Sequence, residues 1–256
     1  MSEIFTDERR RSFDAAAAAY DKFRPSYPEE VIDDILERSQ AVRALEVGAG
    51  TGKATVAFAR CGLEVHALEP GHNLAEILRA KTVALPVTVE ETTFEAFEGG
   101  DFDLVYAASA WHWTDPATRY QKAHAVLHDG GNFALITNEK RPPEDSLRAD
   151  FDAAYAKWFG WKTWDSDHIP KTVGQWSTEI EASGLFRDVV VTYVPWIATY
   201  TSDEFISLID TYSDHVVRPE DEKRGCYADI RAAIDRRGGR CEIPYMTLSF
   251  FALRCD

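Results

Sequence analysis

The sequence lacks several features that mark common functional classes. It has no basic excess, because 28 Lys and Arg residues are outnumbered by 43 Asp and Glu residues, giving a formal net charge of -15. Binding to nucleic-acid phosphates depends on clustered Lys and Arg, so this balance favours a small-molecule substrate and no nucleic-acid partner. The four cysteines form no C-x-x-C pair. We therefore expect reduced thiols, no zinc or redox site, and no metal cofactor.

Long apolar segments are also missing. The N-terminal stretch MSEIFTDERRRS is charged and lacks the apolar core of a secretory signal. No apolar run reaches the length of a bilayer-spanning helix. We expect a cytoplasmic protein without a membrane partner. With 256 residues, 45% of them hydrophobic, the chain is long enough for one large α/β domain.

Two nucleotide-binding signatures are absent as well. No glycine is followed at P-loop spacing by Gly-Lys-Ser/Thr. An NAD-dependent oxidoreductase is disfavoured, because the chain has neither a G-x-G-x-x-G fingerprint nor a Tyr-x-x-x-Lys pair.

The sequence does contain a glycine-rich turn at residues 44–52, which read ALEVGAGTG. The apolar start predicts a buried strand, and residues 53–62 predict a helix. Alternate glycines let the backbone approach a ligand closely and adopt positive φ. Free N–H groups and the helix dipole at that point favour a negatively charged group. The alternative is an ordinary tight strand-to-helix turn.

With its strand-end acid, this turn has the form E-x-G-x-G-T-G, which resembles the first motif of class I S-adenosylmethionine (SAM)-dependent methyltransferases. The resemblance implies that the turn passes beside the methionine part of SAM and that the acid reaches its amino group. S-adenosyl-L-homocysteine would be the product. The cofactor residues implied in this segment are Glu46, Gly48, Ala49, Gly50, Thr51 and Gly52.

A second acid, Glu69, follows the strand predicted at residues 63–68, and Pro70 and Gly71 then turn the chain away. An acid at the tip of the second strand of a βαβ unit can accept hydrogen bonds from two ribose hydroxyls. We therefore predict Glu69 and Pro70 at the cofactor site. Both SAM enzymes and dinucleotide enzymes use such an acid, so alone it does not separate them.

The adenine contacts are predicted in the loop after a third strand at residues 87–89. In the resembled family an acid or amide of this loop reads the adenine, usually an Asp, and Thr93 stands in its place here. The resemblance then leaves Phe94 and Glu95 as candidates. The alternative is that Phe94 is simply a core residue.

A fourth strand at residues 102–108 runs into SAWHWTDP. The phrase D-x-V-x-A-x-x-A-x-H-W resembles the fourth-strand signature of the family and lies at the carboxyl edge of the sheet, where open α/β sheets bind ligands. It assigns Ala107 and Ser109 to the cofactor and Trp111 and Trp113 to the substrate pocket. His112 is the catalytic candidate, because an imidazole titrates near neutral pH and can take a proton from an acceptor or orient it. The alternatives are that His112 lines the cofactor site without proton transfer or that it only packs between the indoles.

The N-terminal region predicts helices at residues 7–20, with Asp7 as a cap, and at 29–38. The segment YDKFRPSYP between them resembles the Y-x-x-x-R-P-x-Y-P element of methyltransferases of the type-11 and trans-aconitate-methyltransferase-like group. The resemblance makes this segment a lid over the cofactor. It assigns Tyr20 and Arg24 to the cofactor and Tyr27 to the substrate pocket. A packed aromatic linker is the alternative.

Beyond residue 138 helical patterns dominate. Helices are predicted at 175–183, 202–215 and 220–237, and strands at 189–194 and 245–253. In the aromatic stretch 155–164, Trp158 is the candidate wall of a substrate pocket; a helical cover packed on its own domain is the alternative.

These elements predict an α/β fold with a Rossmann-like sheet. The resemblance implies seven strands, the last antiparallel, flanked by helices and with helical insertions forming a lid. We expect a single domain over residues 1–256. Its core would comprise 40–138, 186–196 and 243–254, and its helical cover 1–38, 139–185 and 200–240.

The function that follows is SAM-dependent methyl transfer to a small molecule. Family similarity points to a carboxylate acceptor, while a phenol or an amine is equally allowed by the residues. Arg24, Arg119 and Arg141 are available cations. The alternatives are an NAD-dependent oxidoreductase and a SAM- or ligand-binding regulatory protein of the same fold without turnover.

Overall fold

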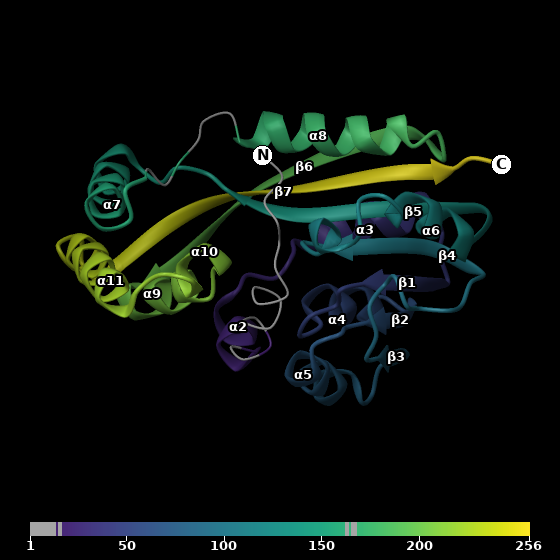
Figure 1. The fold of residues 1–256 in the computed structure, drawn as a ribbon, viewed down its shortest axis with the longest axis horizontal. Helices are drawn as coiled ribbons and strands as arrows, with labels where there is room; N and C mark the ends of the chain where they lie inside the picture. Colours follow the sequence, from purple (N-terminus) through teal and green to yellow (C-terminus); the bar gives the residue numbers. More distant parts are fainter. Residues whose placement is uncertain (1–13, 15–16, 162–163, 165–167) are drawn as a thin grey trace.

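The computed structural model describes residue 14 and residues 17–161, 164 and 168–256. Its centre is a seven-stranded sheet in the order β3-β2-β1-β4-β5-β7-β6 (Figure 1). Strand β7 pairs antiparallel with both of its neighbours, whereas β1 to β5 pair parallel. The predicted fold class, including the antiparallel last strand, is therefore confirmed. The strands are β1 (Arg43–Val47), β2 (Glu64–Leu68), β3 (Val87–Glu90), β4 (Phe102–Ala108), β5 (Leu127–Lys140), β6 (Phe186–Thr201) and β7 (Arg240–Arg254).

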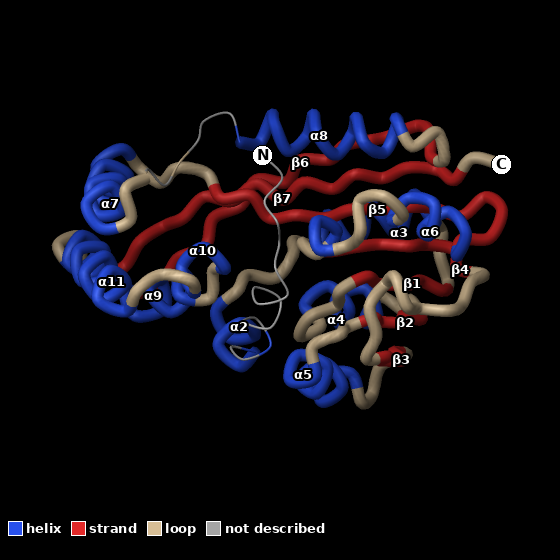
Figure 2. The backbone as a smooth tube through the Cα atoms, in the orientation of Figure 1, coloured by secondary structure: helices blue, strands red, loops and turns tan. Residues whose placement is uncertain are grey.

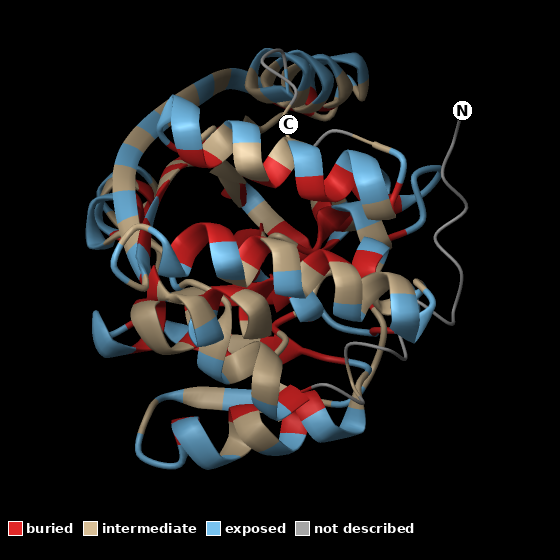
Figure 3. Ribbon diagram, turned by 90° about the vertical axis from the view of Figure 1, so that its left-hand side faces the viewer, coloured by how far each residue is buried: buried red, intermediate tan, exposed pale blue. Residues whose placement is uncertain are grey.

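Helices cover both faces of the sheet (Figure 2). On one face α3, α4 and α5 bury Ile35, Phe58 and Leu78 in one cluster with residues of β1, β2, β4, β5 and β7. On the other face α6 and α8 bury residues such as Tyr120 and Ile180. Along the helices drawn in Figure 3, buried stretches alternate with exposed ones, as amphipathic periodicity requires. The helices concerned are α3 (Glu29–Ser39), α4 (Lys53–Arg60), α5 (His72–Thr82), α6 (Arg119–Val126) and α8 (His168–Ala182).

A second apolar cluster lies at one end of the molecule, where β6 and β7 extend beyond the rest of the sheet (Figure 1). There the two strands pack against helices that we call the cover. The cover helices are α7 (Asp145–Trp158), α9 (Ser202–Asp210), α10 (Ser213–Val216) and α11 (Glu220–Asp235). Short α2 (Ala17–Phe23) contacts both α9 and α5, so it joins the cover to the glycine-rich half of the sheet.

The extended ends of β6 and β7 were not predicted, and the expected strands 189–194 and 245–253 are too short. Pro195 and Pro244 interrupt the apolar patterns. In the structure both prolines lie within the β6–β7 ladder, paired with Met246 and Ile197. Pro195 lies in β6, the edge strand of the sheet, where a proline without an N–H is tolerated, and Pro244 precedes Tyr245, where the pairing of β7 with β5 begins.

Helix boundaries also differ from the sequence expectations. The helix expected at 7–20, with its Asp7 cap, falls mostly outside the described residues, and its described part continues to Phe23 as α2. Helix α8 begins at His168 rather than at residue 175. At the N-terminus of α5, the carboxylate of Asp14, distant in sequence, accepts hydrogen bonds from the N–H groups of Asn73 and Leu74. Within the described residues, no helix combines the length and apolar character needed to cross a membrane.

Candidate functional site

A cavity of about 880 Å³ opens at the carboxyl ends of β1, β2, β4 and β5. The strand order reverses here. From β1 the chain passes to β2 and β3 on one side of β1, and then to β4 and β5 on the other side. Open α/β sheets bind ligands at such a switch point. We call the part lined by residues 46–51 and 69–71 the glycine end. We call the part lined by Lys140, Tyr212, Ser213 and Tyr245 the cover end.

The glycine turn leaves room for a ligand at Gly50. Its φ is +58°, and a Cβ placed there would meet only the ring of Tyr20, at 4.0 Å. Gly52 has another role, because its φ is +81° and a Cβ would come within 2.4 Å of Leu78 in α5. Gly50 therefore faces the cavity, while Gly52 lets α4 and α5 pack closely.

Glu69 holds the glycine end together. Its Oε2 accepts a hydrogen bond of 2.7 Å from the N–H of Gly50, and its Oε1 accepts one of 2.7 Å from the N–H of Gly71. Burial raises the pKa of this carboxyl, while the two backbone hydrogen bonds oppose that rise. Each carboxylate oxygen has a second lone pair, so Glu69 can still accept hydrogen bonds from a ligand.

Glu46 is the second acid at this end and is almost completely buried. Thr55 Oγ1 donates to its Oε2 at 2.5 Å, and the Tyr106 hydroxyl donates to the same atom at 2.9 Å. Desolvation nevertheless raises the pKa of Glu46 to about 7. The carboxyl is therefore poised between its neutral and ionised forms at physiological pH, and a cation brought beside it would favour ionisation.

The N-terminal segment closes the cavity between the two ends. Arg24 donates from Nε to Thr211 Oγ1 at 2.8 Å and from Nη2 to the Thr211 carbonyl at 2.9 Å, which ties the segment to the cover. The Tyr27 hydroxyl donates to Ser109 Oγ at 3.1 Å. Ser109 itself has a φ of +56°, a strained conformation that commonly occurs at functional sites.

The loop after β4 contributes His112 and Trp113 to the cavity wall. His112 is an exposed residue, and it borders the cavity. Desolvation, followed by the positive charge of Arg119, lowers the pKa of His112 to about 4. The ring is therefore neutral at pH 7. It can accept a hydrogen bond, but it is a weaker base than an ordinary histidine.

Arg119 fixes this loop from behind. It is buried, donates to the Trp111 carbonyl at 3.2 Å and forms an ion pair with Glu179 of α8. Of the three arginines considered from the sequence, only Arg24 lines the cavity. Arg119 is engaged in the core, and Arg141 is exposed outside the cavity.

Most of the residues assigned from the sequence line this one cavity. They are Tyr20, Arg24, Tyr27, Glu46, Gly48, Ala49, Gly50, Thr51, Glu69, Pro70, Phe94, Glu95, Ser109, His112 and Trp113. Two of them also serve the structure. Phe94 is buried with its ring centroid 5.8 Å from that of Trp111, and Glu95 Oε1 accepts a hydrogen bond from the Asp115 N–H at 2.8 Å.

Four assigned residues lie away from the cavity lining. Gly52 and Ala107 are buried behind it, and Trp111 belongs to the sheet core, packed on Phe133 at a ring distance of 4.9 Å. Trp158 packs within the cover. Its Nε1 donates to Asp229 at 2.7 Å, and its ring lies where a Cβ on Gly225 would be. Trp158 is thus a cover residue, the alternative that the sequence left open.

Several lining residues had no sequence assignment, chiefly Lys140, Tyr212, Ser213 and Tyr245. Lys140 could have been found, because it is the last residue of β5, and carboxyl ends of parallel strands bear ligands. The others reach the cavity through the folding of the cover, which no local pattern indicates.

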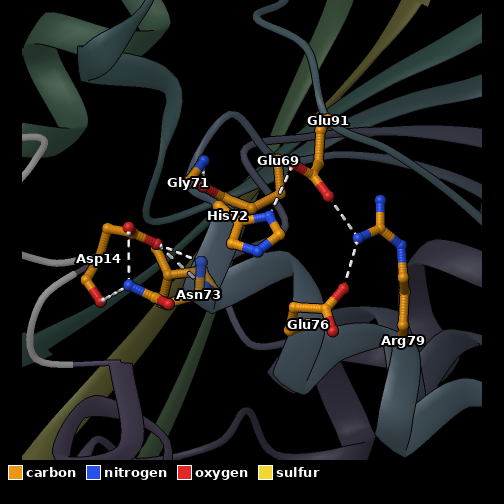
Figure 4. Close-up of polar contacts among 9 residues, drawn as sticks. Asp14, Glu69, Gly71, His72, Asn73, Glu76, Arg79 and Glu91 are labelled. Atoms are coloured by element: carbon orange, nitrogen blue, oxygen red, sulfur yellow. Dashed lines mark hydrogen bonds and ion pairs between the residues drawn. The ribbon is translucent and has the colours of Figure 1, made fainter.

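One exposed group on the described surface has metal-ligand chemistry, namely His72, Glu76 and Glu91 (Figure 4). The guanidinium of Arg79 already bridges the two carboxylates, and His72 Nδ1 lies 3.1 Å from Glu91 Oε2. An internal cation thus occupies the position that a metal would take. The expectation of no metal cofactor stays a prediction.

The sequence is similar to those of known methyltransferases over about half of its length. Residues 45–135 match the protein family described as a methyltransferase domain. Uncharacterized methyltransferases of Mycobacterium bovis and Mycobacterium tuberculosis are each 42% identical over 132 residues, covering 50% of this chain and 53% of theirs. The chain thus spans about half the length of the curated relatives that it matches.

Similarity to solved structures covers more of the chain. A protein from Anaeromyxobacter dehalogenans, named as a candidate type II methyltransferase, aligns over 90% of this chain and 98% of its own with a TM-score of 0.68 and 21% identity. Phosphoethanolamine N-methyltransferase 2 of Haemonchus contortus, solved with S-adenosylhomocysteine, aligns over 97% of this chain and 60% of its own with a TM-score of 0.52 and 16% identity. These likenesses concern the fold.

Proposed function

We propose that this chain, whose residues 45–135 belong to the methyltransferase-domain family and whose sheet is that of the class I SAM-dependent methyltransferases, transfers the methyl group of SAM to a small-molecule acceptor. The observation that carries the proposal is the glycine end. There, the backbone at Gly50 leaves room for a ligand, and two buried acids, Glu46 and Glu69, line the same end of the cavity at the switch point of the sheet.

The chemistry of the lining residues fits the groups of SAM. Glu69 has lone pairs for ribose hydroxyls, and Glu46 can ionise beside an ammonium group. Arg24 has N–H groups left for the methionine carboxylate, and its guanidinium lies 5.2 Å from the ring of Tyr20, next to Gly50. Phe94 and Glu95 border the adenine side. Cofactor binding to these residues is part of the proposal.

When bound, SAM supplies a methyl group activated on a sulfonium, which the lone pair of the acceptor attacks while the C–S bonding pair stays on sulfur. The protein then has to hold the acceptor in line and exclude water. The N-terminal segment and the cover enclose the cavity for this purpose, and neutral His112 can orient an acceptor hydroxyl or take its proton. Among acceptors we favour a small carboxylate, which needs no base.

Calorimetry tests the cofactor. S-adenosylhomocysteine (SAH) or SAM should bind, and NAD should show no measurable binding at similar concentrations. Tight NAD binding without SAM binding would overturn the assignment. A methyl-transfer assay with labelled SAM and candidate acceptors then separates an enzyme from a regulatory protein that binds SAM without turnover.

A further inference from the structure

Two cations contact one aromatic ring at the edge of the cover end. The Nζ of Lys140, the last residue of β5, lies 4.0 Å from the centroid of the Tyr212 ring. The guanidinium of Arg24 lies 4.3 Å from the same centroid. Such contacts stabilise a cation, but they do not neutralise it. Two like charges held this close raise the affinity of the cavity for anions.

Lys140 has no carboxylate partner among the described residues, although the chain carries 43 acidic residues. The neighbouring Glu139 is engaged by His168, whose Nε2 lies 2.7 Å from its Oε2, and by the Thr137 hydroxyl. At the glycine end, Glu46 and Glu69 accept hydrogen bonds from their own neighbours. As far as the described residues go, no carboxylate therefore competes with a ligand for the charge of Lys140.

A second donor beside Lys140 also lacks an acceptor. The Trp164 ring centroid lies 5.8 Å from Lys140 Nζ, and the indole N–H of Trp164 is buried without a hydrogen-bond partner among the described residues. A buried donor left unsatisfied is costly. An ammonium and an indole N–H in one neighbourhood, neither paired with an acceptor among the described residues, suit an oxyanion.

We infer that Lys140 binds an anionic group of the methyl acceptor, a carboxylate or a phosphate ester, against the face of Tyr212. This inference rests on the proposed function. Arg24 contacts the ring of Tyr20, which in turn borders Gly50, so its charge serves the carboxylate of the cofactor, whereas Lys140 lies at the end of β5 beside Tyr212 and Tyr245. An ammonium is a point charge that accepts either oxyanion, so the residue selects charge rather than shape.

The test uses the full chain saturated with SAH and a panel of matched probes. Benzoate and glutarate are compared with benzamide and glutaramide, and phenyl phosphate with phenol, by calorimetry. At least one anion should bind about tenfold or more tighter than its neutral partner. In Lys140→Met this preference should fall below about twofold, and in Lys140→Arg it should persist. If no anion is preferred, or if Lys140→Met keeps the preference, the inference is wrong. A preference for phenyl phosphate alone, or for the carboxylates alone, identifies the oxyanion.

Two controls separate this inference from its premise. Lys157→Met removes an exposed lysine of α7 that pairs with Asp229 outside the cavity, and it should leave every affinity unchanged. SAH affinity should be the same in Lys140→Met and the wild type. If SAH does not bind the wild type, the proposed function itself fails. If SAH binds the wild type but about tenfold more weakly to Lys140→Met, Lys140 belongs to the cofactor site and the inference is overturned.

Discussion

The two ends of the cavity are built in different ways. The glycine end comes from one continuous stretch of chain, residues 44–71, in which strand, turn, helix and strand follow each other. The cover end brings together Lys140, Tyr212 and Tyr245, which reach it from β5, the start of α10 and β7. One end is local in sequence, and the other exists only after the whole chain has folded.

The two ends also differ in the contacts that hold their charged side chains. At the glycine end, the acids accept hydrogen bonds from backbone N–H groups and buried hydroxyls, so their positions are fixed by the register of β1, β2 and β4. At the cover end, charged groups lie over ring faces and have no carboxylate partner in the part of the chain that the structure describes. The comparison teaches that the glycine end can be inferred from a local pattern, whereas the cover end depends on long-range packing.

Removing the Glu69 carboxylate should have the largest effect on SAH binding, and the effect should be confined to the glycine end. Glu69→Ala should weaken SAH binding by roughly 2–4 kcal/mol, since charge-assisted hydrogen bonds contribute about 1.5–3 kcal/mol each and water replaces them in part. The variant should still fold, although Gly50 and Gly71 lose their acceptor. Calorimetry measures the affinity and circular dichroism the fold.

Glu64→Ala is the matched control, because Glu64 is an exposed acid at the opposite end of β2. Its SAH affinity should equal that of the wild type. Unchanged SAH affinity in a folded Glu69→Ala protein would remove the ribose role from Glu69. Each probe of the panel, anionic or neutral, should bind Glu69→Ala with the same affinity as it binds the wild type. That result would show that the two ends act separately.

Much of the fold and the glycine end was predictable for physical reasons. Alternating apolar strands and amphipathic helices encode the layers, and the E-x-G-x-G-T-G turn places its own residues at the carboxyl edge. The seven strands and the antiparallel last strand were predicted through the resemblance, and the structure confirms both. The sequence correctly indicated a turn that needs positive φ, because Gly48, Gly50 and Gly52 all have it.

The cover end was not predictable, because its residues carry no local signature. A lysine at a strand end and a tyrosine before a short helix are common surface residues, and only the packing of α9 and α10 brings Tyr212 to Lys140. Trp158 shows the reverse error. It was assigned to a pocket because aromatic residues cluster around it, but the cluster fills the interior of the cover.

Titration of Glu46 should have a smaller effect on SAH affinity, and it tests the glycine end separately from the cover end. The pKa of Glu46 is about 7, and the amino group of the cofactor favours its ionised form, so binding should release a proton below pH 7. SAH affinity should fall by up to about tenfold per pH unit below 7 and level off above it. Calorimetry in buffers of different ionisation enthalpy measures the released proton. In Glu46→Gln the pH dependence should disappear, and its persistence there would assign it to another group.

The stability of the unliganded protein provides a second measurement of the same group. The pKa of Glu46 is raised on folding, from an ordinary value of 4.5 to about 7, so its contribution to stability is fully present below the unfolded pKa and is lost as pH rises through the folded one. Glu46→Gln cannot ionise. Between pH 5 and pH 8 its free energy of unfolding should therefore decrease less than that of the wild type. Equal decreases would show that Glu46 is not the titrating group.

The smallest effect is expected at His112, which lies on the wall where the two ends meet. Because the pKa of His112 is about 4, its ring is neutral across pH 5 to 9 and is a weak base. His112→Asn keeps a hydrogen-bonding group but cannot accept the proton. Once an acceptor is identified, we expect kcat to fall by less than about tenfold, with SAH affinity retained and no change in the pH profile between 6 and 8. A fall of about a hundredfold with SAH affinity retained would instead make His112 the general base. A fall in SAH affinity would place it in the cofactor site.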